Sequence, residues 1–175
     1  MTITYYRTYS NCPSQNFKPI DGSFCNKPRG GLWGCKGTEW VSWCISEEFP
    51  CPEHYFVWKF KDEVKIFTID TEYDFLYLLE VYPLWDTTMD KVISIDYMKL
   101  QKDYDAVELT TKGNNLMHHG INMSFSPKTL YAAKILNDDK YSLAKMLGVN
   151  SWDVPSICVF NPKETVEIVN FNRRT

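Results

Sequence analysis

The chain has 175 residues, the usual length of one domain, and we expect a single domain over residues 1–175. Its formal net charge of −3 argues against general nucleic-acid binding, because that function needs a basic face to displace counterions from phosphates. No apolar run approaches the roughly 20 residues that span a bilayer, and the polar start Met1-Thr2-Ile3-Thr4 does not resemble a signal peptide. We therefore expect a cytoplasmic protein without membrane segments.

The six cysteines are expected to be reduced, because the sequence shows no export signal. Cys44, Cys51 and His54 are close in sequence and are the candidates for a zinc site. Structural zinc prefers paired ligands, and no Cys-x-x-Cys or His-x-x-x-His pair occurs here. The sequence therefore predicts no metal centre.

The N-terminal part of the chain predicts two strands and a helix around a long loop. Residues 3–9 are rich in tyrosine and threonine and predict a strand, whereas residues 11–29 contain the proline, asparagine, serine and glycine typical of a loop. Residues 31–35 predict a second short strand. Thr38 precedes an acidic residue and an apolar run, which predicts a capped helix over residues 39–45 that the following prolines end.

The middle of the chain begins with two β-rich runs, residues 55–61 and 64–69, joined by Asp62-Glu63. This arrangement predicts an antiparallel hairpin. Residues 71–79 then predict a capped amphipathic helix, and residues 95–101 predict another short helix.

The next part of the chain mixes strands, a loop and helices. Residues 106–109 predict a strand, residues 111–120 a polar loop and residues 121–125 a brief strand. The spacing of apolar residues over 128–147 predicts two helices, broken near Asn137-Asp138-Asp139.

The C-terminal part predicts a buried strand over residues 156–160 and a last edge strand over residues 165–170. Short strands in mostly antiparallel runs, with irregularly placed helices between them, favour an α+β fold over a βαβ dinucleotide fold. A Gly-x-Gly-x-x-Gly turn and a Walker A sequence are both absent, which argues further against a βαβ dinucleotide fold and against a P-loop fold.

The stretch Lys27-Pro28-Arg29-Gly30-Gly31-Leu32-Trp33-Gly34-Cys35 combines chain breakers with a tryptophan, and Trp40 and Trp43 follow it closely. The Gly-Gly pair would let the backbone approach a ligand, and the tryptophans offer flat faces on which a planar ring can stack. The alternative is a Gly-Gly turn leading into an aromatic strand, with Trp40 and Trp43 as the buried stripe of a helix. The motif alone leaves both interpretations open.

Four motifs follow one another along the chain: Tyr5-Tyr6-Arg7-Thr8-Tyr9-Ser10, Gly30-Gly31-Leu32-Trp33-Gly34, Trp40, and Ser156-Ile157-Cys158-Val159-Phe160-Asn161-Pro162. Their order resembles the layout of the ADP-ribosyltransferase superfamily, whose members carry Arg or His on a first strand, contacts on a second strand, and an acid at or near a late strand. The Gly-Leu-Trp and Tyr-Asp-Ala elements also resemble those of uncharacterised phage and prophage proteins. The resemblance implies two small, mostly antiparallel sheets that form a split β core with flanking helices.

The resemblance further implies that NAD lies, as substrate, in a cleft between the two sheets. Arg7 would hold a phosphate or the ribose side of NAD, and Trp33 or Trp40 would stack on a ring. The backbone of Gly30-Gly31 would bind the nicotinamide carboxamide or the adjacent ribose. The complete set of cofactor-binding residues expected on this basis is Arg7, Ser10, Gly30, Gly31, Leu32, Trp33, Trp40 and Ser156.

The implied reaction needs a carboxylate, because nicotinamide leaves the ribose through an oxocarbenium-like state that carries positive charge. The late strand begins with Ser156, where the family has an acid. Asp153, in the turn before that strand, and Glu108, on the strand predicted over residues 106–109, are therefore the candidate catalytic acids beside Arg7. The pair His118-His119 is a further candidate for a general base.

The resulting expectation is an NAD-dependent mono-ADP-ribosyltransferase that modifies a macromolecular acceptor, a protein or a nucleic acid, as a phage or bacterial effector in the host cytosol. A binding module that keeps the cleft without a catalytic acid is the second hypothesis, and Ser156 at the acid position favours it. An inhibitor or interaction protein that exposes its aromatic residues to a partner is the third. The sequence indicates no oligomeric state.

Overall fold

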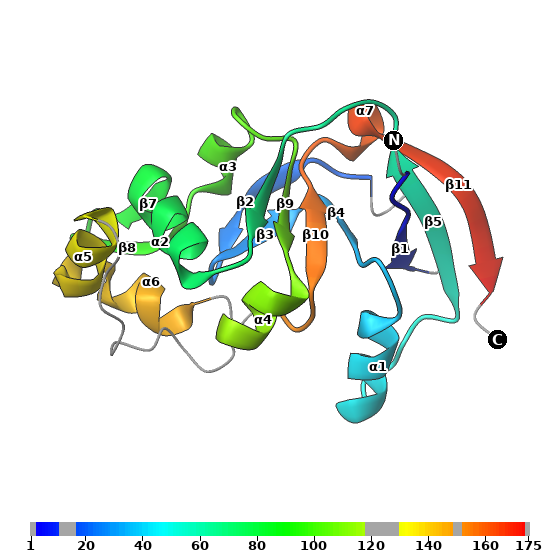
Figure 1. Cartoon of the computed structure of the whole chain (residues 1–175), viewed down its shortest axis with the longest axis horizontal. Coiled ribbons are helices and arrows are strands. Elements are labelled where there is room, and N and C mark those ends of the chain that lie inside the picture. The colour runs from blue at the N-terminus through cyan, green and yellow to red at the C-terminus, as the bar shows by residue number, and fades with distance from the viewer. Residues whose placement is uncertain (1–2, 11–16, 118–129, 149–151, 174–175) are drawn as a thin grey trace.

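A computed structural model describes residues 3–10, 17–117, 130–148 and 152–173 of the chain. The fold is α+β and combines several small sheets with short helices (Figure 1). A three-stranded sheet lies at one end of the molecule, a four-stranded sheet lies in the centre, and helices with a β-hairpin form the other end. None of the helices described is long and apolar enough to cross a membrane.

The central sheet has the strand order β4-β10-β9-β6. Its strands are β4 (Leu32–Gly34), β6 (Ile66–Ile69), β9 (Ala106–Leu109) and β10 (Ser156–Val159). β10 is antiparallel to both of its neighbours, whereas β6 is parallel to β9. The end of β4 lies beside the start of β10, because Gly34 pairs with Ile157.

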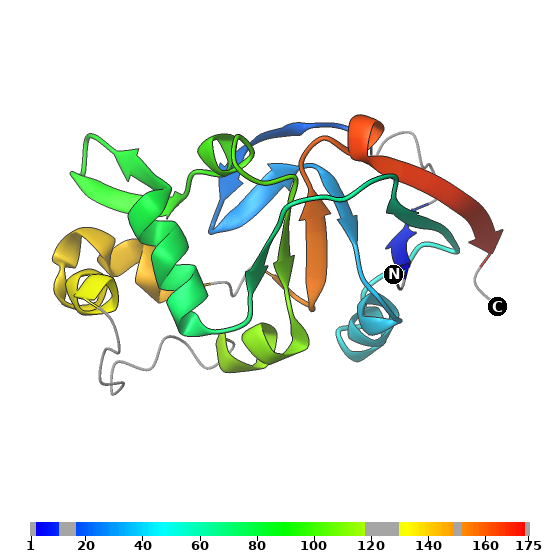
Figure 2. The same ribbon diagram turned by 45° about the horizontal axis from the view of Figure 1, so that its top comes forward.

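The second sheet has the order β1-β5-β11, and both of its pairings are antiparallel. Its strands are β1 (Tyr6–Tyr9), β5 (His54–Phe60) and β11 (Val166–Arg173). β11 forms the outer edge and curves away from the central sheet (Figure 2). The two sheets meet where the N–H of Arg7 donates to the carbonyl of Cys35 at 2.8 Å and the N–H of Cys35 donates back at 3.0 Å. This bridge places Arg7 beside the end of β4.

Two hairpins and a set of short helices complete the fold. The hairpins are β2 (Ile20–Phe24) with β3 (Lys27–Gly30), and β7 (Pro83–Asp86) with β8 (Lys91–Ile95). The helices are α1 (Glu39–Ser46), α2 (Glu72–Val81), α3 (Tyr97–Leu100), α4 (Thr111–Met117), α5 (Leu130–Asn137), α6 (Ser142–Leu147) and α7 (Pro162–Thr165), with a 3-10 turn, η2 (Asp139–Tyr141), before α6.

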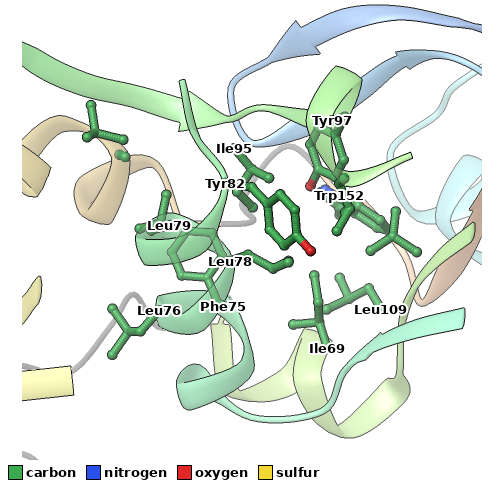
Figure 3. Close-up of a cluster of buried hydrophobic side chains, with 14 of the residues drawn as sticks. Ile69, Phe75, Leu76, Leu78, Leu79, Tyr82, Ile95, Tyr97, Leu109 and Trp152 are labelled. Carbon is green, nitrogen blue, oxygen red and sulfur yellow. The ribbon is translucent and has the colours of Figure 1, made fainter. Parts of the chain in front are cut away.

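Two clusters of buried hydrophobic side chains stabilise these layers. In the larger cluster, α2 packs Phe75 and Leu78 towards the region that also holds Tyr97 and Trp152 (Figure 3). The largest side chains of the smaller cluster, which joins the two sheets, are Tyr6, Leu32, Phe56 and Trp58. Burial of apolar surface at roughly 25 cal/mol per Å² makes such clusters the main favourable contribution to folding.

Many of the predicted elements are confirmed, as is the α+β class. The strands predicted within residues 3–9, 31–35, 106–109, 156–160 and 165–170 are β1, β4, β9, β10 and β11. The helices predicted within residues 39–45, 71–79, 95–101 and 128–147 are α1, α2, α3 and the pair α5 and α6. The predicted cap of α2 is present and takes the form of a capping box, in which the backbone N–H of Thr71 donates to the Asp74 carboxylate at 2.8 Å.

The predicted hairpin of residues 55–61 and 64–69 is wrong. Both runs form strands, β5 and β6, but β5 pairs with β1 and β11, whereas β6 pairs with β9 in the other sheet. The reason is the burial of their apolar side chains in different places. Trp58 of β5 lies in the cluster between the sheets, and Ile69 of β6 lies in the cluster around α2.

Two predicted loops contain regular structure. Within residues 11–29, the chain forms the hairpin β2–β3, whose two turn residues Cys25 and Asn26 have φ of 46° and 59°. Positive φ at both positions is the type I′ geometry, which Asn favours but Cys does not signal. Within residues 111–120, the chain forms α4, and the hairpin β7–β8 had no predicted counterpart. The predicted strand at 121–125 lies outside the described residues.

Candidate ligand-binding site

A cavity of about 310 Å³ opens where the two sheets meet, and we call it the Arg7 cavity. β1 contributes Arg7, Thr8 and Tyr9 to its wall, and β4 contributes Trp33 and Gly34. The rest of the wall comes from α1 and the proline-rich segment after it, from the start of β3, and from the residues around the start of β10. Its volume is at the lower end of the range of about 300 to 1,000 Å³ that small-molecule sites occupy.

Arg7 is half-buried in this wall, and its guanidinium forms no ion pair with a carboxylate among the described residues. It is held by aromatic side chains instead, through a hydrogen bond with Tyr9 and a position 5.6 Å from the centre of the Tyr55 ring. Burial raises the pKa of Tyr9, and the hydrogen bond with Arg7 partly opposes this rise. A partly desolvated guanidinium without a carboxylate is a suitable partner for an anionic ligand.

Aromatic rings form the apolar part of the Arg7 cavity. Trp33 is fixed by a hydrogen bond from its indole N–H to the carbonyl of Gly30 at 3.0 Å. It also packs edge to face against Trp152, with the two ring centres 4.8 Å apart. Trp40, on α1, stacks on Trp43 with the ring centres 4.9 Å apart. These fixed rings provide faces on which a base or a nicotinamide can stack at low entropic cost.

The charged groups of the wall are two cations and one carboxylate, so the Arg7 cavity is net positive in a chain of net charge −3. In the same wall, Lys27 pairs with Asp153 at 3.6 Å between Nζ and Oδ2. Ser156 also lines the cavity and donates its hydroxyl to the carbonyl of Val154 at 3.0 Å. The balance of charge favours an anionic ligand.

The paired glycines do not line the Arg7 cavity, in contrast to the prediction. Gly31 has φ of 70°, and a Cβ there would lie 2.5 Å from Sγ of Cys158 and 2.8 Å from the carbonyl oxygen of Val159. Gly30 has φ of 80°, and its Cβ would lie 2.6 Å from the carbonyl oxygen of Pro19. Glycine is therefore required here by the close approach of the chain to itself.

Two further residues of the predicted set also lie away from the Arg7 cavity wall. The side chain of Leu32 is completely buried in the smaller hydrophobic cluster, so it cannot contact a ligand. Ser10 follows β1, and its backbone N–H donates to the carbonyl of His54 at 3.0 Å. Of the predicted residues, those that line the cavity are Arg7, Trp33, Trp40, Asp153 and Ser156.

A second cavity of about 240 Å³ adjoins the first, and we call it the Glu108 cavity. The two cavities share the wall residues Gly34, Cys35 and Ser156. Glu108 lies in the second cavity, where Lys36 approaches its carboxylate at 2.6 Å. The two candidate acids, Glu108 and Asp153, therefore lie in different cavities, and each is paired with a lysine.

Cys35, in the wall shared by the cavities, is a buried thiol. Burial raises the pKa of Cys35 to about 11, so the thiol stays protonated near neutral pH and is a poor nucleophile. The described cysteines form no disulfide with one another. The candidate base pair His118-His119 lies outside the described residues.

Three further residues line the Arg7 cavity although their sequence motifs did not predict it: Tyr9, Lys27 and Phe49. Lys27 stands in the basic cluster before the Gly-Gly pair, and Tyr9 is two residues from Arg7, so both had a local signal. Phe49 had no such signal in the sequence, because its position in the cavity wall depends on the path that the chain takes after α1.

A scan against protein-family models matched none, and searches of the curated proteins and of the solved structures likewise returned no similar protein. The resemblance to ADP-ribosyltransferases therefore stays a prediction.

Proposed function

We propose that the protein binds NAD in the Arg7 cavity and acts as a mono-ADP-ribosyltransferase on a macromolecular acceptor, most simply a protein. The observation that carries this proposal is the half-buried guanidinium of Arg7, which faces an aromatic cavity without a carboxylate partner among the described residues. Such a group lowers its free energy by pairing with a phosphate, and a guanidinium can do so through two parallel hydrogen bonds.

The arrangement of the sheets supports the same proposal. The resemblance implies a split β core made of two small sheets, and what supports it is that the three-stranded and the four-stranded sheet are bridged between Arg7 and Cys35. The Arg7 cavity lies at this bridge, with walls from both sheets. A cleft between two sheets is where the resemblance expects the nicotinamide dinucleotide.

The residues present fit a dinucleotide in their charges and their aromatic rings. Arg7 and Lys27 would hold its phosphates, and Trp33 and Trp40 would stack on its rings. Bound NAD supplies a ribose whose bond to nicotinamide breaks heterolytically, with the electron pair leaving on nicotinamide. Asp153 is the carboxylate of this cavity, and its role would be to stabilise the positive charge that develops on the ribose.

A second function, binding of a nucleotide without turnover, is favoured by one observation. Both candidate acids are neutralised by lysines, Asp153 by Lys27 at 3.6 Å and Glu108 by Lys36 at 2.6 Å. A protein of this kind would act by binding a partner or by sequestering the nucleotide. The two functions share the cavity and differ in whether a carboxylate becomes available to the ribose.

The experiment that tests the proposal combines a binding assay and a transfer assay on the full chain. NAD labelled in its adenylate part is incubated with the protein and a cell lysate, and release of nicotinamide is measured in parallel. We expect label on the protein itself or on a target, and loss of that label in Arg7→Met. Arg173→Met is the matched control, because Arg173 pairs with Glu53 at 3.3 Å and is not part of the cavity wall.

The outcomes separate the hypotheses. Label that depends on Arg7 but not on Arg173 supports the transferase. Binding of NAD by calorimetry without release of nicotinamide selects the binding module. Absence of NAD binding by the wild-type protein would falsify both functions and favour an interaction protein.

A further inference from the structure

The side chains of Arg7, Tyr9 and Tyr55 lie on one face of the three-stranded sheet. Arg7 and Tyr9 are two residues apart on β1, and side chains at that spacing point to the same side of a strand. Tyr9 is directly opposite Tyr55 of β5 in the antiparallel register, so these two residues share a face as well. Tyr6 and Trp58, which belong to the smaller hydrophobic cluster, occupy the other face. The three side chains therefore form a group of their own, from which Arg7 and Tyr9 line the cavity.

Contacts within this group hold the Arg7 guanidinium next to the Tyr9 side chain. The guanidinium carbon of Arg7 lies 5.6 Å from the centre of the Tyr55 ring, and the centre of the Tyr9 ring lies 5.5 Å from the same point. Arg7 also forms a side-chain hydrogen bond with Tyr9. The polar ends of Arg7 and Tyr9 are thus positioned by each other and by one shared ring.

The hydrogen bond between Arg7 and Tyr9 does not use the hydroxyl proton of Tyr9. A guanidinium has five N–H donors and no acceptor, so Arg7 donates and the oxygen of Tyr9 accepts. Within residues 3–10, 17–117, 130–148 and 152–173, the Tyr9 hydroxyl has no other hydrogen-bond partner. Burial raises the pKa of Tyr9, so the hydroxyl keeps its proton at neutral pH. The cavity wall therefore contains a neutral donor that no acceptor of the described chain occupies.

A phosphate group matches the two donors. The guanidinium fork of Arg7 can bind two phosphate oxygens through parallel N–H bonds, which leaves a third oxygen for a hydroxyl. The carboxylate of the cavity wall, Asp153, does not take this place, because its ion pair is with Lys27 at 3.6 Å. An incoming phosphate is therefore the acceptor that both Arg7 and Tyr9 lack.

We propose that Tyr9 is a second phosphate-binding residue of the Arg7 cavity, whose hydroxyl donates to the same phosphate group that the Arg7 guanidinium holds. This inference rests on the proposed function, because it needs a phosphate-bearing nucleotide in the Arg7 cavity. It adds a neutral donor to a site that the proposed function describes by its charges and its aromatic rings. The phosphate is then recognised by the arrangement of two donors on one strand as well as by charge.

The test measures the affinities of ADP and adenosine for the full chain by calorimetry, with adenosine followed by competition against ADP. The two ligands share the base and the ribose and differ in the phosphates. Tyr9→Phe removes one oxygen and keeps the ring beside Tyr55. It should weaken binding of ADP by about tenfold, the effect of one hydrogen bond to a charged group, and change the affinity for adenosine by less than about twofold.

Tyr55→Phe is the matched control. It also removes one phenol oxygen, but it keeps the ring beside Arg7, and Tyr55 is not part of the cavity wall. It should change the affinity for ADP by less than about twofold. The stoichiometry of each titration reports the folded fraction, so a less stable variant is not mistaken for one with a weaker site.

A double-mutant cycle tests whether the two side chains hold the same phosphate. If they do, the combination of Arg7→Met with Tyr9→Phe should lose less affinity for ADP than the product of the two single losses. Losses that multiply exactly would mean that Arg7 and Tyr9 act on separate parts of the ligand, and they would overturn the inference.

The remaining results also point in different directions. A loss of ADP affinity in Tyr9→Phe that spares adenosine, and that does not occur in Tyr55→Phe, supports the inference. Unchanged ADP affinity in Tyr9→Phe, or equal losses for ADP and adenosine, overturns the inference alone, since the nucleotide site itself would still be present. Failure of the wild-type protein to bind ADP overturns the inference together with the proposed function.

Discussion

The Arg7 cavity and the Glu108 cavity share Gly34, Cys35 and Ser156, yet they differ in how fully their cationic side chains are paired with carboxylates. In the Glu108 cavity, Lys36 pairs with Glu108 at 2.6 Å and Lys112 pairs with Asp70 at 2.7 Å, so each lysine already has an anion. In the Arg7 cavity, the guanidinium has no carboxylate among the described residues, and the one ion pair is long.

A ligand gains most free energy in the cavity whose charges are not already paired. A cavity whose charges are already paired gives an incoming ion little, because each new contact replaces an existing one. A cavity with an unmatched, half-buried guanidinium and fixed aromatic faces offers contacts that nothing else in the described chain provides. The Arg7 cavity is therefore the better candidate for an anionic, ring-bearing ligand, although both cavities lie beside the same strands.

The first prediction concerns Asn26, whose side-chain hydrogen bonds hold the turn before Lys27 of the Arg7 cavity wall. Asn26→Gly removes the side chain but keeps the φ of 59° accessible, and it leaves the carbonyls of Ala144 and Gly148 and the N–H of Ile95 without their partner. The free energy of unfolding should fall by about 3 kcal/mol in urea denaturation. Cys25→Gly, at the neighbouring turn position, should change it by less than about 1 kcal/mol. A small effect of Asn26→Gly would show that these hydrogen bonds do not hold the turn in place.

A second test concerns Tyr6, whose ring lies in the wall of the Glu108 cavity. Burial, and then the charge of Glu108, raise the pKa of Tyr6 from 10.0 to about 12. The folded state thus favours the neutral hydroxyl, and this stability is fully present below pH 10 and is lost as the pH rises towards 12. The loss should reach about 2.5 kcal/mol.

The measurement for Tyr6 is the free energy of unfolding at about pH 9 and pH 12. Tyr6→Phe should show a smaller fall over this range than the wild-type protein, because it has no hydroxyl to ionise. Tyr5→Phe, at an exposed position, is the control and should follow the wild type. Identical pH profiles for Tyr6→Phe and wild type would refute the assignment.

Gly34 tests the wall that the two cavities share. A Cβ at this position would lie 2.7 Å from Cζ2 of Trp58, a fully buried ring that Tyr6 stacks upon. Gly34→Ala should therefore lower the free energy of unfolding by about 2 kcal/mol through overpacking. Gly37→Ala is the control, since the atoms nearest to its Cβ would belong to the flexible Glu39 side chain, and it should cost less than about 1 kcal/mol. Equal losses of stability in the two variants would show that Gly34 is not needed for the close packing against Trp58.

The last prediction concerns the ion pair of Lys112 and Asp70 in the Glu108 cavity, whose removal should change stability least. Lys112 and Asp70 form an ion pair at 2.7 Å, and the hydrogen bond with Lys112 holds the pKa of Asp70 below its usual value. Both side chains are well exposed, so Lys112→Met should leave the free energy of unfolding unchanged within the error of urea denaturation. The affinity for ADP should also stay the same. A clear loss of nucleotide binding would indicate that the ligand lies in the Glu108 cavity and not in the Arg7 cavity.

The sequence predicted local structure well where one segment carries its own signal. The capping box of α2 and the apolar run of β10 are examples, because cap and burial are encoded within a few residues. It failed where a partner is chosen at long range. β5 and β6 are adjacent in sequence but belong to different sheets, since the choice depends on which cluster buries Trp58 and Ile69.

The candidate site shows the same division. The motifs selected Arg7, Trp33, Trp40, Asp153 and Ser156, which come from four separate segments and line one cavity. The same motifs misplaced the Gly-Gly pair, because a glycine that approaches a ligand and one that approaches its own chain look identical in sequence. The two are distinguished by the folded chain, in which Pro19, Cys158 and Val159 leave no room for a Cβ at either glycine.

The most direct test of the central claim is the affinity for NAD of three forms of the full chain: wild type, Arg7→Met and Lys36→Met. Each variant removes one cation, from the Arg7 cavity and from the Glu108 cavity respectively. We predict that wild type binds, that Arg7→Met weakens binding by roughly 100-fold through loss of a bidentate contact, and that Lys36→Met changes it by less than about twofold. Equal effects of the two substitutions, or no binding by the wild-type protein, would contradict the account.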